Sequence, residues 1–94
     1  MKKGTVLYIR EDYRVEGVEI TEKDFQDHIA YLEKLAKERY LLCGGFTEKA
    51  GGMIIFEASS KAEALKIASG DPLIARKLFT TDITPWEMLV VTKG

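Results

Sequence analysis

The sequence predicts an α+β fold in which two helices cover one face of a four-stranded antiparallel sheet. The prediction comes first from the order of apolar patterns, which is strand, helix, strand, strand, helix, strand. That order is the split βαβ, or ferredoxin-like, arrangement. It comes also from size, since 94 residues with 46% hydrophobic content are enough for one core. Residues 1–94 are therefore expected to form a single domain.

The first half of the chain is assigned from local signals. A β-rich run begins at Val6, and Thr21 with Asp24 resembles a capping box before a segment of helical apolar period. Two further apolar runs flank a polar, glycine-ended segment of hairpin character. The predicted elements are a strand over 4–10, a loop over 11–16, a helix over 22–39, a strand over 40–46, a hairpin segment over 47–52 and a strand over 53–56.

The second half contains clearer boundaries. Ser60 and Glu63 form a capping box before an alanine-rich segment that stops at Gly70, which we expect to end the helix in the left-handed region. Pro72 suits the first turn of a short helix, and Pro85 restricts the last strand to an edge or a bulge. The predicted elements are a helix over 61–69, a short helix over 73–78 and a strand over 80–92.

The strands are apolar on both of their alternating faces, as the run Met53 to Phe56 illustrates. Two helices can cover only one of those faces. An exposed apolar patch of this size is unusual on a monomer. We therefore expect a homodimer in which two copies pack sheet against sheet.

Composition excludes several classes of protein. The net charge of -1 lacks the basic excess of nucleic-acid-binding proteins, and no apolar run is long enough to span a bilayer. We expect a cytoplasmic protein with no nucleic-acid or membrane partner. One histidine and one cysteine provide neither a two-histidine pair nor a thiolate cluster, so no metal and no other cofactor is expected.

His28 is the only histidine and falls on the apolar stripe of the first helix. It is either a satisfied structural residue or a reagent in a pocket. Asp71 is either the N-cap of the short helix or a partner of His28, because the antiparallel helices bring the two positions near each other. A carboxylate beside one ring nitrogen raises the basicity of the other, as acid–base chemistry requires.

Four other positions are weighed in the same way. Cys43 is expected to be a small buried core residue. Gly44 and Gly45 lack the spacing of a phosphate loop and suit a bulge or a close approach to a ligand. Tyr8 points its hydroxyl into a pocket or packs in the core. We name Tyr8, Gly44 and Gly45 as candidate substrate-binding residues.

The ordered set of motifs resembles the YCII-related family. The resemblance covers most of the chain and rests on His28, Gly44-Gly45, the stretch 56–68 with Ala62 and Ala64, Asp71-Pro72, Phe79 and Pro85-Trp86. It implies a dimeric α/β-barrel fold and a pocket built around a His and Asp pair, here His28 and Asp71. Some relatives are dehydrochlorinases of chlorinated hydroxyquinones. The chain departs from the commoner pattern at Phe25, where relatives carry an arginine.

The function indicated by these residues is a small cofactor-free enzyme. His28 would act as general acid or base with Asp71 as its partner, in elimination or isomerisation of a small aromatic or carbonyl-containing compound. The alternative is a noncatalytic dimeric module that binds a small ligand or a protein. A hydrogen-bonded pair at a cavity favours the enzyme, and a packed histidine with no cavity favours the module.

Overall fold

Four strands form one antiparallel sheet in the order β2-β3-β1-β4. The structure is a computed structural model and describes residues 1–93. Strand β1 lies at the centre between β3 and β4, and β2 pairs only with β3, as the split βαβ order requires. The elements are β1 (Val6–Arg14), α1 (Glu22–Ala36), β2 (Leu41–Gly45), β3 (Gly52–Phe56), α2 (Lys61–Ser69), α3 (Pro72–Ala75) and β4 (Phe79–Glu87).

Strand β1 is longer than the sequence predicts. Residues 11–14 were expected to begin a loop, but they continue the strand. Pairing with β4 runs from Val6 opposite Glu87 to Arg14 opposite Phe79, so the ladder rather than side-chain polarity sets the end of β1. Strand β4 in turn ends at Glu87 instead of residue 92. It lies at the edge of the sheet, where a proline such as Pro85, which has no amide hydrogen to donate, is tolerated.

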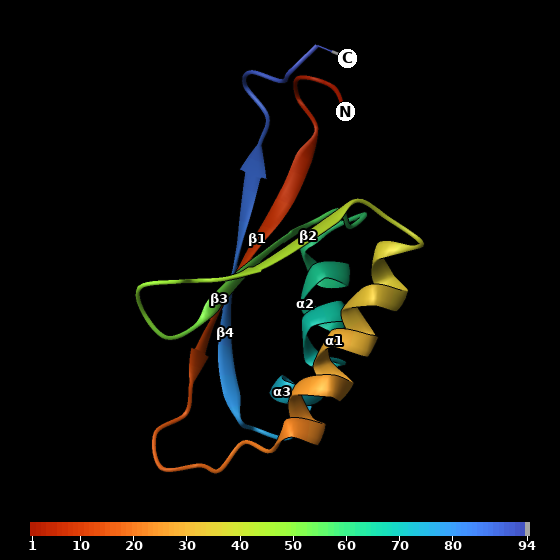
Figure 1. Cartoon of the computed structure of the whole chain (residues 1–94). Coiled ribbons are helices and arrows are strands. Elements are labelled where there is room, and N and C mark those ends of the chain that lie inside the picture. Colours follow the sequence, from red (N-terminus) through yellow and green to blue (C-terminus); the bar gives the residue numbers. More distant parts are fainter. Residues whose placement is uncertain (94) are drawn as a thin grey trace.

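The helices lie on one side of the sheet, and the core lies between them and the strands (Figure 1). Its buried residues come from β1, β3, α1 and α2: they are Tyr8, Leu32, Ile54, Phe56 and Ala64. The segments before β1 and after β4 lie side by side, and the Gly4 amide donates to the Met88 carbonyl at 2.8 Å. No helix in the described part of the chain is long and apolar enough to cross a membrane.

Helix boundaries follow the predicted caps at their starts and differ at two ends. Thr21 and Asp24 form the reciprocal capping box of α1, but the helix ends at Ala36, three residues early, because the chain leaves it through a turn. Helix α2 has the predicted bounds, with the Ser60 side chain accepting from the Glu63 amide. Each start is thus explained by a local side-chain bond.

Gly70 has a different role from the one predicted. Its φ is -80°, in the right-handed region, so it needs no positive backbone angle. A Cβ there would lie 2.5 Å from the Tyr31 hydroxyl oxygen. That hydroxyl donates to the Ile67 carbonyl at 2.7 Å. A larger residue at position 70 would therefore displace the Tyr31 side chain and disturb this hydrogen bond.

Helix α3 begins one residue before the predicted 73–78 and ends three residues early, ahead of Lys77, whose φ of 61° is left-handed. It is connected to the start of α1 by Arg76, which donates to Asp24 Oδ1 and to Asp27 Oδ2 at 2.8 Å each. Such exposed ion pairs contribute little stability. Their position nevertheless shows that the segment following α2 lies directly against the first turns of α1.

The face of the sheet away from the helices carries a row of apolar side chains. Side chains alternate along each strand, so the neighbours of the core residues point outward. Leu42, Ile55 and Ile9 lie in register across three strands, and Trp86 lies on the same face of β4. Leu42 is 56% and Trp86 45% exposed in the single chain. Large apolar side chains thus remain accessible on this face in the single chain.

Candidate functional site

His28 and Asp71 meet between α1 and the junction of α2 and α3. The His28 Nδ1 lies 2.7 Å from Oδ2 and 2.9 Å from Oδ1 of Asp71. Asp71 is fully buried and His28 is 6% exposed. The Asp71 side chain also accepts from the Leu73 amide at 2.9 Å, so it is an N-cap as well. The two interpretations of Asp71 are therefore compatible, and the cap holds the carboxylate in place for the imidazole.

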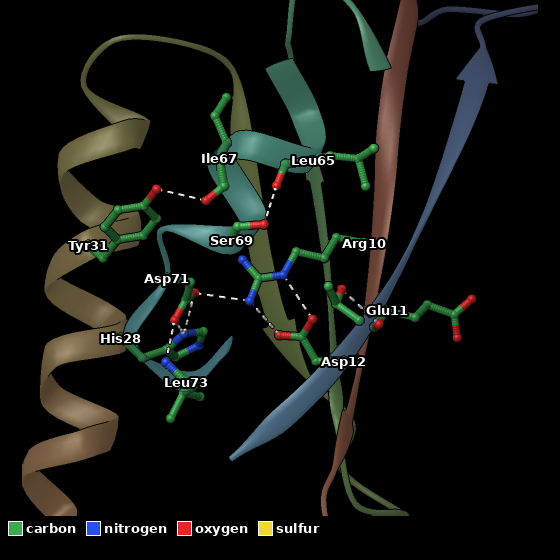
Figure 2. A network of polar contacts seen from close by, with 11 residues as sticks. Arg10, Glu11, Asp12, His28, Tyr31, Leu65, Ile67, Ser69, Asp71 and Leu73 are labelled. Carbon is green, nitrogen blue, oxygen red and sulfur yellow. Dashed lines mark hydrogen bonds and ion pairs between the residues drawn. The ribbon is translucent and has the colours of Figure 1, made fainter. Parts of the chain in front are cut away.

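A buried arginine lies behind the pair (Figure 2). The Arg10 Nη2 donates to Asp71 Oδ2 at 3.0 Å and to Asp12 Oδ2 at 2.8 Å, and its Nε donates to Asp12 Oδ1 at 2.8 Å. Arg10 is 1% exposed. Arg10 and Asp12 are two positions apart on β1, so both side chains point to the helix-covered face. The guanidinium thus bridges two carboxylates in a water-poor environment.

Sequence reasoning missed both Arg10 and Asp12. A polar stretch that follows directly on an apolar run is commonly a solvated loop, and single arginines are commonly exposed. The signal that could have revealed them is their period-two spacing within a strand. An arginine and an aspartate at i and i+2 share one face of a strand, and a charge facing a core requires a buried partner.

The charges of this network decide the protonation of His28. Arg10 contributes one positive charge and the carboxylates of Asp12 and Asp71 contribute two negative charges, so the buried group is neutral only when His28 is an imidazolium. Burial, the largest single influence, lowers the pKa of His28. The hydrogen bond and charge of Asp71, together with Cys43, outweigh burial and raise the pKa from 6.5 to about 9.

Asp71 responds in the opposite direction. Burial raises its pKa, but the hydrogen bond from His28, the charge of Arg10 and the Leu73 amide together hold the pKa below the ordinary 3.8. Asp71 is therefore an ionised acceptor at neutral pH, and the Nδ1 of His28 carries the proton between them. The opposite ring nitrogen, Nε2, is the one left for other chemistry.

A cavity of about 460 Å³ adjoins His28. His28 and Asp12 contribute to its wall, and the loop between β2 and β3 contributes Lys49. The other lining residues are mostly apolar or glycine: Phe25, Ile29, Cys43, Gly44, Gly45, Phe46, Ala50, Gly51, Gly52, Met53, Ile54, Leu73 and Phe79. A volume of this size is typical of pockets for small molecules.

The predicted site residues fall in different places. Gly44 and Gly45 line the cavity, where the absence of side chains leaves the β2 backbone accessible. Tyr8 does not belong to the described lining: it packs in the core with its ring 6.4 Å from that of Phe56, so a substrate contact has no support in the geometry. Cys43 was expected to be buried but is exposed, because its side of β2 faces the cavity.

Phe25 occupies the position where the family pattern has an arginine. Its ring meets the His28 ring edge-on with 5.6 Å between the ring centres, and it is 51% exposed at the cavity. The nearest guanidinium to the pair in the hydrogen-bond network comes from β1 instead, through Arg10. The helix thus presents an aromatic surface to the cavity where a charge was expected.

Comparisons with known proteins agree with this architecture. The model of the YCII-related domain matches residues 5–87. A solved structure of 5-chloro-2-hydroxyhydroquinone dehydrochlorinase from Burkholderia phenoliruptrix AC1100, in complex with 2,5-dihydroxybenzoquinone, is similar with a TM-score of 0.72. The likeness has 23% sequence identity and covers 86% of this chain and 93% of that one, so it shows a shared fold. Among the curated proteins, none matches significantly.

Proposed function

The chain belongs to the YCII-related family, and from that premise and its buried ion network we propose that it is a small-molecule enzyme that uses His28 and Asp71 for proton transfer. The observation that carries the proposal is the pair itself, hydrogen-bonded at 2.7 Å in the wall of a cavity. The substrate class is a small aromatic or carbonyl-containing compound. The reaction is an elimination or an isomerisation, and it needs no metal or organic cofactor.

The protonation state suggests the order of events. With a pKa of about 9, His28 is an imidazolium at neutral pH, so its first act is to donate the Nε2 proton to a basic atom of the substrate. The neutral imidazole then accepts a proton from a neighbouring carbon. The proton count is unchanged at the end of an isomerisation. Asp71 stays ionised throughout and stabilises each imidazolium state.

The relative supplies the first compounds to test. The similar dehydrochlorinase was solved with a dihydroxybenzoquinone, so hydroxyquinones and cyclic ketones form a reasonable panel. Deuterium incorporation from heavy water, followed by NMR, detects proton abstraction at carbon even when no net product forms. We expect the protein to accelerate exchange in at least one panel member.

Two variants on α1 make the assay specific. The His28→Gln variant should lose exchange by about a hundredfold or more, the usual contribution of a general acid or base. The Gln26→Ala variant, on the exposed side of the same helix, should retain the native rate. Undiminished exchange in His28→Gln would refute the assignment, and ligand binding without exchange by the native protein would identify a noncatalytic binding module.

We also propose that two copies associate through the open face of the sheet. The support is the apolar row of Leu42, Ile55 and Ile9 together with Trp86, of which Leu42 and Trp86 are exposed and the two isoleucines are half-buried. Light scattering at micromolar concentration should give twice the chain mass. Ile55→Lys should produce monomers or aggregates, whereas Glu33→Lys on the solvent side of α1 should not. A monomeric native protein would overturn this assembly.

A further inference from the structure

Lys49 is a cation that the proton-transfer chemistry does not use. It stands in the loop between β2 and β3 and lines the cavity together with Phe46 and His28. Its Nζ lies 4.6 Å from the centre of the Phe46 ring. The loop is closed by the Phe46 amide, which donates to the Gly51 carbonyl at 3.1 Å. Lys49 is therefore held at the cavity by its own loop.

No carboxylate within residues 1–93 forms an ion pair with Lys49. The one carboxylate in the cavity wall, that of Asp12, is already bound by two nitrogens of Arg10. A cation–π contact at an exposed site is weak enough to be exchanged for an anionic partner.

The rest of the cavity suits a flat apolar molecule. Three phenylalanines from three different segments contribute to the wall: Phe25, Phe46 and Phe79. Aromatic side chains bind ring systems by stacked or edge-to-face contact. Lys49 adds positive charge to this apolar wall, whereas the charge of His28 is balanced by the carboxylates of its buried network. Aromatic surface next to a cation without a carboxylate partner recognises a small aromatic anion.

We propose that Lys49 is a specificity-determining residue that binds the anionic oxygen group, carboxylate or phenolate, of the small aromatic compound held in this cavity. The inference rests on the proposed function, since it concerns the same pocket, but it assigns recognition to Lys49 and leaves proton transfer to His28. The ammonium lies over the Phe46 ring, and binding of the anion turns it toward the anionic oxygen.

Benzoate and benzamide provide a matched pair of probes, because they share ring and shape and differ in charge. Binding is followed by NMR through the amide signals of Gly44 and Gly45. The native protein should bind benzoate about fivefold more tightly than benzamide, as one partly exposed charge-assisted contact permits. Added salt should weaken benzoate binding and leave benzamide binding unchanged.

Substitution then locates the source of the preference. Lys49→Met keeps the length and apolar stem of the side chain, and it should abolish the preference for benzoate while benzamide binds as before. Lys61→Met, at the exposed start of α2, removes the same charge away from the cavity and should preserve the preference. A preference that persists in Lys49→Met, equal binding of both probes by the native protein, or no benzoate binding at tens of millimolar overturns the proposal.

The two proposals about this pocket fail in different ways. If the acid–base function is wrong, no panel compound exchanges deuterium, yet the benzoate preference and its loss in Lys49→Met are still observed. If the role of Lys49 is wrong, exchange still depends on His28 while Lys49→Met binds the two probes as the native protein does. Titration of the native protein and of Lys49→Met with 2,5-dihydroxybenzoquinone extends the test to a phenolate-type anion.

Discussion

Replacing Asp71 with asparagine removes one charge from the centre of the buried network and preserves the shape of the side chain. The asparagine carbonyl can still accept from the Leu73 amide and cap α3, and Arg10 keeps both of its bonds to Asp12. His28 loses the carboxylate that lies 2.7 Å from its Nδ1. The variant therefore tests the electrostatic role of Asp71 with little change to the local fold.

The expected size of the effect follows from the native pKa. The rise in the His28 pKa from 6.5 to about 9 corresponds to about 3 kcal/mol of preference for the imidazolium. Burial acts against that rise and persists in the variant. We expect the His28 pKa to fall toward the ordinary 6.5 in Asp71→Asn, because only the influence of Cys43 is then left to raise it against burial.

The measurement is unambiguous because the chain has a single histidine. Its imidazole carbon and nitrogen shifts, followed by NMR across the titration, belong to His28 without further assignment. Asp82→Asn is the matched control. Asp82 is an exposed aspartate of β4 on the face of the sheet away from the helices and His28, so this variant makes the same charge change away from the site. An unchanged His28 titration in Asp71→Asn, or a native titration near 6.5, would refute the coupling.

Three further predictions concern stability. Gly70→Ala should destabilise the fold because the added Cβ meets the Tyr31 hydroxyl. Tyr31→Phe in the same chain should recover part of that loss, so changes in stability that simply add in a thermal double-mutant cycle would contradict the contact. Arg10→Met leaves the buried Asp12 carboxylate without its cation and leaves Asp71 paired with His28 alone. It should lower the unfolding free energy in urea by about 3 to 5 kcal/mol, so a loss below about 1 kcal/mol would show that the bridge contributes little. Because the His28 pKa is higher in the folded protein, protonation of His28 stabilises the fold; this stabilisation is complete below pH 6.5 and is lost as pH rises toward about 9. The melting temperature of the native protein should therefore fall over that interval, and that of Asp71→Asn should stay nearly level.

Local signals were enough to predict the helix starts. The side chains of Thr21 and Ser60 each accept a hydrogen bond from the amide three residues later. Both partners of the bond that starts each helix therefore lie within one short stretch of sequence. The end of β1 could not be found in this way. Residues 11–14 are polar and become strand only because β4, more than sixty residues away in sequence, pairs with them.

The candidate site was predictable in part for the same reason. The proximity of His28 to Asp71 could be predicted because the antiparallel arrangement of the two helices follows from the order of elements alone. The contribution of Arg10 depends on a three-dimensional contact with Asp71 across 61 positions, for which no local spacing exists. The need for glycine at position 70 likewise depends on a neighbour, the Tyr31 hydroxyl, that only the folded structure brings there.

The β2–β3 loop has a consequence for how such a site diverges in evolution. The ion network takes its side chains from β1, α1 and the segment between α2 and α3, whereas residues 46–51 contribute only to the cavity wall. Changes of length in a surface loop cost little chain entropy. Mutations in this loop can therefore reshape the cavity, while the ion network around His28 and Asp71 remains assembled and needs no compensating change.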